Sequence, residues 1–206
     1  MEPSFSPKGT ISHNKLNELI QLAYSLGVSG ATIISSPDIP IKDELANFCK
    51  PPNCGNYGLS PYCPPYNSGP AGFRELQKNF RYALVVRIDI PSATLFSNEY
   101  REVMKWLHEV VATIEQAALR IGFSQARAFA AGACKDLFCH NYPDCPILLK
   151  SGECRFPEYA RPSMSGFGIN VAELMKACGW SVNINVQKSE LDSESMSWVA
   201  GLILIS

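Results

Sequence analysis

Hydrophobic residues in the first part of the chain switch between helical and strand spacing. In "HNKLNELIQLAYSLG" the apolar residues Leu16, Leu19, Ile20 and Ala23 recur at helical intervals, and a glycine follows where a helix would end. "GATIISS" then predicts a short strand, because β-branched residues dominate it. "IKDELANFC" predicts one or two helical turns, and "AGFRELQKN" predicts another short helix. The first part of the chain is therefore expected to combine helices with at least one strand.

The second part continues the same interleaving. "YALVVRIDI", from Tyr82 to Ile90, is β-branched and predicts a strand. Residues Glu99 to Ile121 carry one apolar stripe and predict a long amphipathic helix. "GFSQARAFAAG" predicts a strand and "GFGINVAELMKACGW" a helix. "SVNINVQ" and "SWVAGLILIS" predict two closing strands, which we expect to pair as an antiparallel hairpin.

Helices that interleave with strands favour an α/β or α+β fold, in which a mixed β-sheet is covered by helices. A length of 206 residues fits a single domain spanning 1–206. A chain of this size can bury a core without covalent cross-links. Two irregular segments interrupt the pattern, and we expect them to form cysteine-rich metal-binding loops at 49–66 and 134–163.

Composition narrows the range of partners. The net charge is −1, charged residues make up 18% of the chain, and no run of lysine and arginine is present, so nucleic acid is not expected as a partner. The beginning of the sequence lacks the pattern of a signal peptide, and no apolar run is long enough to span a membrane. We therefore expect a cytoplasmic protein without a membrane partner, whose thiols stay reduced.

Seven of the eight cysteines fall in the two irregular segments. The first cysteine set is Cys49, Cys54 and Cys63, and the second cysteine set is Cys134, Cys139, Cys145 and Cys154. Several sulfurs must converge on a soft metal centre, which a loop can arrange by wrapping around it. Neighbouring prolines stiffen such a wrap, and glycines let the backbone turn there. The pattern therefore predicts metal binding by both sets.

The spacing favours an iron–sulfur cluster over zinc. Structural zinc sites use close pairs of ligands, taken twice, whereas each set here has gaps of four to eight residues. A proline directly after a ligand cysteine also occurs in ferredoxins, although their two-residue gaps are absent. Structural zinc remains the alternative cofactor, and disulfides or unligated core thiols remain less favoured explanations.

The two sets differ in a way that bears on function. Four thiolates in the second set can close a four-iron cluster, whereas three in the first set leave one iron open for another ligand. We therefore expect two [4Fe-4S] clusters that act in electron transfer to a redox partner protein. One alternative is a redox enzyme or small-molecule-binding protein that uses the open iron, with the ligand at the three-cysteine cluster. Another is a structural zinc protein.

The motifs "CGNYGLSPYCPP", "AAGACKDLFC" with the later "CRFP", and "ARPSMSGFGINV" resemble those of a family of predicted cysteine-rich metal-binding proteins, found mostly in anaerobic bacteria and archaea. The resemblance runs from about Lys42 to Asn185 and includes all seven cysteines of the two sets. It implies metal binding, with iron–sulfur clusters as the expected form, and it names no reaction.

Four further residues are candidates for roles at these sites. Arg155 and Arg161 follow Cys154 closely, and a guanidinium there would stabilise a negatively charged cluster and raise its potential. The alternative is that each is a surface or ion-paired arginine. His140 follows Cys139 and is expected to be a loop histidine rather than a ligand. Cys178 lies on the apolar face of a predicted helix, so we expect it to be buried and unligated; the alternative is an eighth ligand.

Overall fold

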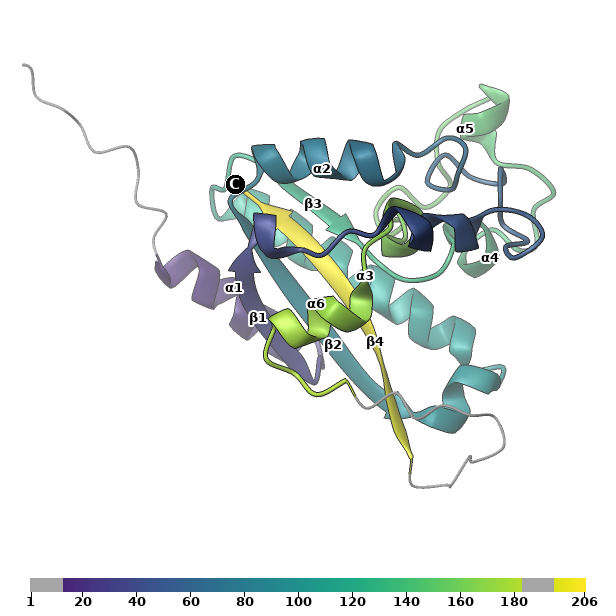
Figure 1. Ribbon diagram of the computed structural model, residues 1–206. Coiled ribbons are helices and arrows are strands. Elements are labelled where there is room, and N and C mark those ends of the chain that lie inside the picture. Colours follow the sequence, from purple (N-terminus) through teal and green to yellow (C-terminus); the bar gives the residue numbers. More distant parts are fainter. Residues whose placement is uncertain (1–12, 183–194) are drawn as a thin grey trace, which may run out of the picture.

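The computed structural model describes residues 13–182 and 195–206 of the chain. Its elements comprise helices, short 3-10 helices (η) and strands in the following order: α1 (His13–Ser25), β1 (Gly30–Ser35), η1 (Ser36–Asp38), η2 (Asp43–Cys49), α2 (Gly69–Asn79), β2 (Tyr82–Pro91), η3 (Ser92–Phe96), α3 (Tyr100–Arg120), β3 (Ala126–Phe129), α4 (Cys134–Leu137), α5 (Pro146–Leu149), η4 (Met164–Phe167), α6 (Val171–Ala177) and β4 (Met196–Ile205). Helices and strands alternate along the chain, as the hydrophobic pattern predicts (Figure 1).

The four strands form one sheet in the order β1-β2-β4-β3. Every pairing between these strands is antiparallel. The expectation of a mixed sheet is therefore wrong for the described strands, whereas the combination of a sheet with covering helices is confirmed. Alternating helices and strands are typical of parallel crossovers. Here the connection through α3 does join two strands that run in the same direction, β2 and β3, but β4 lies between them and pairs antiparallel with both.

One face of the sheet is covered by α1 and α3. Strand side chains on this face include Leu84 and Val86 of β2 and Ile203 of β4, all buried against the two helices. The long helix α3 packs closely on β4 at Gly201, where an added Cβ would overlap Val111 Cγ1 and lie 3.3 Å from Leu107 Cδ1. The apolar stripe predicted for residues Glu99 to Ile121 is therefore the face of α3 that lies on the sheet.

The opposite face is covered by α2, η4 and α6. The alternate residues of the same strands, such as Val85 and Leu202, point to this side and pack into a second buried cluster. Its centre is aromatic, because the ring of Phe73 contacts those of Phe129 and Phe167 with centroids 5.1 and 5.7 Å apart. The sheet is thus the middle of three layers.

The connections of this sheet carry the two cysteine sets. Ser35 at the end of β1 pairs with Tyr82 at the start of β2, so residues 36–81 leave and rejoin the sheet at one end. The first cysteine set lies in this connection, and the second lies in the connection that follows β3. Figure 1 shows both connections beside each other, next to α4 and α5.

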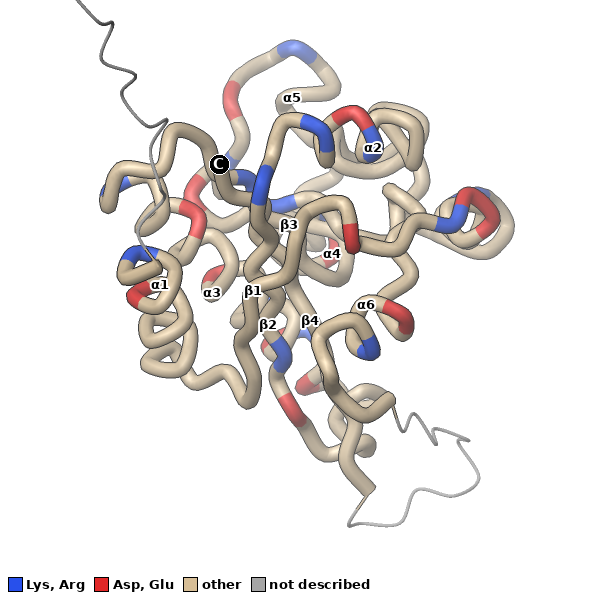
Figure 2. Tube along the Cα trace, turned by 60° about the vertical axis from the view of Figure 1, so that its left-hand side comes forward, with Lys and Arg blue, Asp and Glu red and all other residues tan. Residues whose placement is uncertain are grey.

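Most predicted elements are present within small shifts of their ends. The expected strand at "GFSQARAFAAG" is shorter, because β3 covers only Ala126–Phe129. Of the closing strand expected at "SVNINVQ", residues 183–187 lie outside the described residues, and so does the predicted hairpin turn. Basic and acidic residues are interspersed along the described chain (Figure 2). Within the described residues, no helix is long and apolar enough to cross a membrane.

Candidate metal centre

The segment that carries the second cysteine set is closed at its base by backbone hydrogen bonds. The N–H of Ala130, just after β3, donates to the carbonyl of Pro162 at 2.9 Å, and the N–H of Met164 donates to the carbonyl of Ala130 at 3.0 Å. The intervening residues 131–161 therefore leave the sheet and return to it at the same point. All four cysteines of the second set lie inside this closed loop.

A buried histidine on α3 also holds both ends of this loop. His108 has no exposed surface; its Nδ1 accepts the N–H of Arg161 at 3.2 Å, and its Nε2 lies 3.1 Å from the carbonyl of Ala131. Because Nδ1 is an acceptor here, Nε2 carries the proton and donates it to Ala131. Burial lowers the pKa of His108 to about 4, which keeps the ring neutral.

Arg161 is paired with α3 rather than directed at a sulfur. Its guanidinium contacts Glu115 Oε2 at 2.6 Å and donates to the carbonyls of Pro157 and Ala160. Glu115 Oε1 in turn accepts the N–H of Ala128 in β3 at 2.6 Å. This nearly buried ion pair fastens the end of the loop to both α3 and the sheet.

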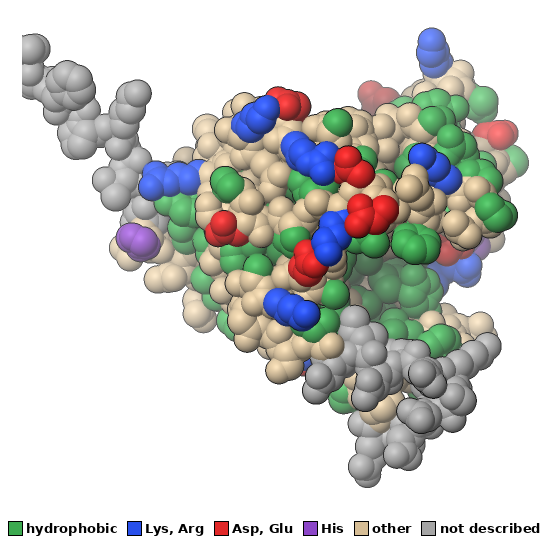
Figure 3. All heavy atoms as spheres, in the orientation of Figure 1, with side chains coloured by type: hydrophobic (Ala, Val, Ile, Leu, Met, Phe, Trp, Pro, Cys, Tyr) green, Lys and Arg blue, Asp and Glu red, His purple; other side chains and the backbone are tan. Residues whose placement is uncertain are grey.

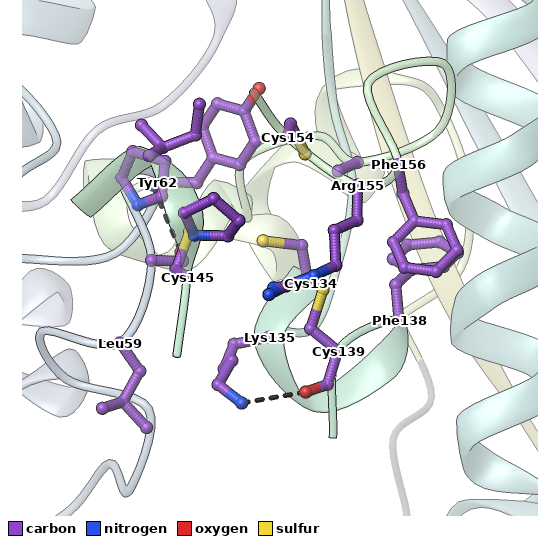
Figure 4. Close-up of a pocket in the computed structure, with 15 residues that line it drawn as sticks. Leu59, Tyr62, Cys134, Lys135, Phe138, Cys139, Cys145, Cys154, Arg155 and Phe156 are labelled. Carbon is purple, nitrogen blue, oxygen red and sulfur yellow. Dashed lines mark hydrogen bonds between the residues drawn. The ribbon is translucent and has the colours of Figure 1, made fainter. Parts of the chain in front are cut away.

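The four cysteines of the second set line one cavity of about 260 Å³, which we call the thiol cavity. Cys134 begins α4, Cys145 directly precedes α5, and the other two follow these short helices (Figure 4). All eight cysteines of the chain lie in the described part, and none forms a disulfide. The spacing in the sequence therefore does bring these four thiols to one place.

The thiols surround the cavity instead of meeting at a single point. Within the described residues, no three Cys, His, Asp or Glu side chains are close enough to hold one metal ion together. Burial raises the pKa of Cys134 to about 12 and also raises the pKa of Cys139. A hydrogen bond from Arg155 acts in the opposite direction on Cys139. In the absence of a bound cation, burial thus favours the protonated thiols.

Two cationic side chains border the thiol cavity. Arg155 lies on the ring of Tyr142, with its guanidinium carbon 4.2 Å from the ring centroid, and donates to the carbonyl of Asp144 at 2.8 Å. Lys135 donates to the carbonyl of Cys139 at 2.8 Å (Figure 4). Both positive charges are therefore held beside the sulfurs by bonds within the loop. His140 is exposed and does not line the cavity.

The first cysteine set is also gathered in space. Cys49 ends η2, and burial raises its pKa, with further contributions from the negative charges of Cys54 and Cys63. Burial likewise raises the pKa of Cys63, and Cys54 adds to that shift. The thiols therefore lie within electrostatic reach of one another. A hydrogen bond of 2.7 Å from the N–H of Gly58 to the carbonyl of Pro64 closes the turn between them.

The two sets meet at residues 59–62, which form one wall of the thiol cavity although they belong to the first segment. Tyr62 lines the cavity together with Cys154. Burial raises the pKa of Tyr62, and the charge of Cys154 adds to this shift. Ser60 lines the thiol cavity together with Cys134, and its carbonyl accepts the N–H of Cys63 at 3.2 Å. The first and second sets are therefore direct neighbours.

Cys178 lies apart from both sets. It caps the C-terminal end of α6, is half-buried, and packs against the core on the α2 side of the sheet. Burial alone raises its pKa to about 12, without a contribution from another cysteine. The expectation that Cys178 is buried is thus met only in part. Which of the eight cysteines bind metal stays a prediction.

Three residues of this region were missed by the sequence analysis as parts of the site: Ser60, His108 and Glu115. Serine, histidine and glutamate are common on loops and helices, and the parts of the site that they face here lie far away in the sequence. For His108 alone a signal existed, because it falls on the apolar stripe of the long helix.

Taken together, these features define a protein of sheet and helices in which two neighbouring cysteine sets lie at one end. The chain belongs to a family described as predicted metal-binding proteins (DUF2284), whose model matches residues 32–205. The resemblance noted in the sequence is thereby confirmed, and metal binding is supported at this level. The searches of curated proteins and of solved structures gave no match.

Proposed function

We propose that this chain is an iron–sulfur protein that holds two [4Fe-4S] clusters and passes electrons to a partner protein. The observation that carries the proposal is the thiol cavity, where four unpaired cysteines of one closed loop face the same space. Cys134, Cys139, Cys145 and Cys154 would hold one cluster there. Such a cluster would supply a centre that accepts and releases one electron.

The size of the thiol cavity supports a cluster over a single zinc ion. Four thiolates on one zinc, at about 2.3 Å each, would stand only about 3.8 Å apart with no space between them. A cavity of about 260 Å³ is several times the roughly 30 Å³ that one water molecule occupies in the liquid. The second set therefore leaves room for a group of several atoms.

The first set would hold the second cluster through Cys49, Cys54 and Cys63, which leaves one metal position without a cysteine. Residues 59–62 of the first segment line the thiol cavity, so the two clusters would be neighbours, which favours electron transfer between them. Arg155 and Lys135 would offset the negative charge that thiolates bring to the cavity. A redox role is therefore the function that this arrangement supports best.

The surface around the two sets supports a protein as the electron partner. Seven of the large apolar side chains that remain exposed belong to residues 48–66 and 142–159: Phe48, Leu59, Tyr66, Tyr142, Ile147, Leu149 and Tyr159. Figure 3 shows apolar side chains at the end of the molecule where α5 lies. Exposed aromatic and aliphatic groups gathered at one end are typical of a surface that another protein covers.

Metal and sulfide analysis after purification without oxygen tests the proposal. We expect a brown protein with about eight irons and as much acid-labile sulfide per chain. Dithionite should reduce it reversibly, with the paramagnetic signals of two reduced clusters and no loss of iron. A colourless protein that contains zinc alone would contradict the proposal and establish the structural alternative.

One observation favours a second candidate, a small-molecule site at the three-cysteine set. An open cavity of about 530 Å³ is bordered by Lys50 and by Pro64, the neighbours of Cys49 and Cys63, although no cysteine lines it. An iron without a cysteine ligand would bind small anions, and cyanide is a suitable probe. Cyanide should change the signal of one cluster only; two unchanged signals would reject this candidate.

A further inference from the structure

We propose that Lys135 is a positioning residue of the second cysteine set. It holds the backbone of Cys139 at the thiol cavity, and its fixed positive charge raises the reduction potential of the cluster in that cavity while leaving the potential of the other cluster unchanged. The inference rests on the proposed function, because it concerns a cluster bound by the second set. Neither the cysteine spacing nor the family description assigns a role to this lysine.

Lys135 ties the turn after α4 back to that helix. It follows Cys134 directly within α4, and its side chain lines the thiol cavity. Its ammonium donates to the carbonyl of Cys139 at 2.8 Å (Figure 4). The same ammonium also donates to the carbonyl of Tyr142. Both acceptors lie beyond the end of α4, so one side chain holds the helix and the following turn together.

The backbone of Cys139 is held by two further hydrogen bonds. Its N–H donates to the carbonyl of Lys135 at 3.2 Å, and its carbonyl accepts the N–H of Tyr142 at 3.0 Å as well as the ammonium. Lys135 therefore contacts Cys139 through both its main chain and its side chain. A ligand residue whose backbone is already fixed loses less conformational freedom when metal binds, which favours binding.

The charge of Lys135 is not neutralised by an acidic side chain in the described part of the chain. Two other charged residues of the same loop are ion-paired, since Asp136 binds Arg101 and Arg161 binds Glu115. Lys135 is half-buried and bonds to neutral carbonyls instead. A partly buried charge without a counter-charge is costly, and metal-bound thiolates in the cavity would supply the missing negative charge.

The lysine beside the first set is placed differently. Lys50, which follows Cys49, is exposed and donates to Asn47 Oδ1 at 2.9 Å. Water and salt screen an exposed charge far more than a half-buried one. A cluster that accepts an electron gains negative charge, and a fixed cation nearby stabilises that reduced state. Lys135 should therefore raise one of the two potentials only.

Redox titration of the iron-loaded full chain, monitored by paramagnetic resonance, tests the role of the charge. In Lys135→Met one reduction equilibrium should change about tenfold, equivalent to a fall of about 59 mV for one electron, and the other should stay unchanged. Lys135→Arg keeps the charge and should keep both potentials. Lys150→Met is the matched control, because Lys150 lies on the same loop but is exposed and does not line the cavity. Two unchanged potentials in Lys135→Met, or equal shifts of both, would overturn the inference.

Hydrogen exchange on the metal-free chain tests the positioning separately. The amide of Tyr142 should exchange faster in Lys135→Met, because its acceptor, the carbonyl of Cys139, is no longer held by the ammonium. Lys135→Arg should keep the slower exchange of the unchanged protein. Equal exchange in Lys135→Met and the unchanged protein would show that Lys135 does not fix this turn, and would overturn the positioning role.

The outcomes also separate this inference from the proposed function. An unchanged chain that binds no iron would overturn the proposed function. An iron-loaded chain whose potentials do not respond to Lys135→Met would overturn this inference alone. Should Lys135→Met fail to hold the second cluster, Lys135→Arg decides: both potentials at the values of the unchanged protein support the role of the charge, and altered potentials reject it.

Discussion

His108 shows how a single side chain can fix the geometry of a distant loop. It joins α3 to Ala131 and Arg161, which stand at the two ends of the segment that carries the second cysteine set. Its ring also contacts Phe138 edge-on, with centroids 5.4 Å apart. The neutral ring is needed, because Nδ1 must accept the N–H of Arg161 and cannot do so when protonated.

This requirement predicts how stability depends on pH. The pKa of His108 is about 4 in the folded protein, lowered by burial and to a smaller extent by the charge of Arg161, against about 6.5 in the unfolded chain. Between these values the unfolded chain binds a proton that the folded protein does not. The free energy of unfolding should therefore fall as the pH drops from 6.5 towards 4, by about 3 kcal/mol from this group.

Replacement by an amide side chain isolates this contribution. In His108→Gln, the decrease in the free energy of unfolding between pH 7 and pH 4.5 should be smaller by about 2–3 kcal/mol than in the unchanged protein. Urea unfolding at each pH measures it. His13→Gln is the control, because it makes the same substitution at an exposed position at the start of α1. An unaltered dependence in His108→Gln would show that the pKa of His108 is the same in the folded protein and in the unfolded chain.

Two single-residue variants distinguish a cysteine that binds metal from a cysteine that only packs in the fold. Cys139→Ser should lose about half of the bound iron, since one of the two proposed clusters would lack a ligand. Cys178→Ala should keep all of the iron, because burial alone raises the pKa of Cys178 and no other cysteine contributes to that shift. Iron analysis of proteins prepared side by side measures both. Loss of half of the iron in Cys178→Ala would make this residue the eighth ligand.

At the scale of elements, the contact between α3 and β4 depends on the lack of a side chain at Gly201. A Cβ there would overlap Val111 and come within 3.3 Å of Phe129 O, so the helix would have to move away from the sheet. Gly201→Ala should therefore lower the free energy of unfolding by about 1–3 kcal/mol, as overpacking in a core does. Denaturant unfolding at neutral pH measures the change.

A second substitution tests the cause of that loss. Val111→Ala removes the methyl groups that the new Cβ would meet, so the double variant should lose less stability than the sum of the two single variants. Strict additivity would show that the cost of Gly201→Ala arises elsewhere, for example in the conformation of the strand itself.

Local patterns predicted these elements, but not their arrangement. The apolar stripe of α3 and the β-branched run of β2 are properties of neighbouring residues, and both elements have the expected bounds to within one residue. The direction of β1 relative to β2 depends on the pairing of Ser35 with Tyr82 across a long connection. Helix and strand alternation alone does not reveal such a pairing, which explains the incorrect expectation of a mixed sheet.

For the candidate site too, local sequence patterns predicted the grouping within one segment but not the contacts between distant segments. Cysteine spacing predicted that four thiols gather in one place, because that grouping is encoded within a short segment. The contact between the two sets brings residues 59–62 beside Cys134, and β2, α3 and β3 lie between these segments in the sequence. Arg155 lies beside the thiols as expected, whereas Arg161 is held by Glu115, a partner that the sequence could not indicate.

At the scale of the whole molecule, the residues that form the hydrophobic core differ from the residues of the first cysteine-bearing segment. Both core clusters are formed by helices and strands, and no residue of 42–66 belongs to either of them. The second segment is better anchored, because Leu137 of α4 is buried in the core beneath α3. Metal binding should therefore stabilise the two segments far more than it stabilises the sheet.

Hydrogen exchange on metal-loaded and metal-free protein tests this separation. After metal removal, amides of β2 and β4 should keep their protection, because their packing is intact without metal. Amides of 49–66 should exchange fastest, and those of 134–154 should show an intermediate effect, limited by the hydrogen bonds at Ala130 and His108. Small zinc domains behave differently, because they unfold entirely without their metal. Loss of protection in β2 and β4 on metal removal would therefore show that the whole fold, and not only its cysteine-bearing end, depends on the bound metal.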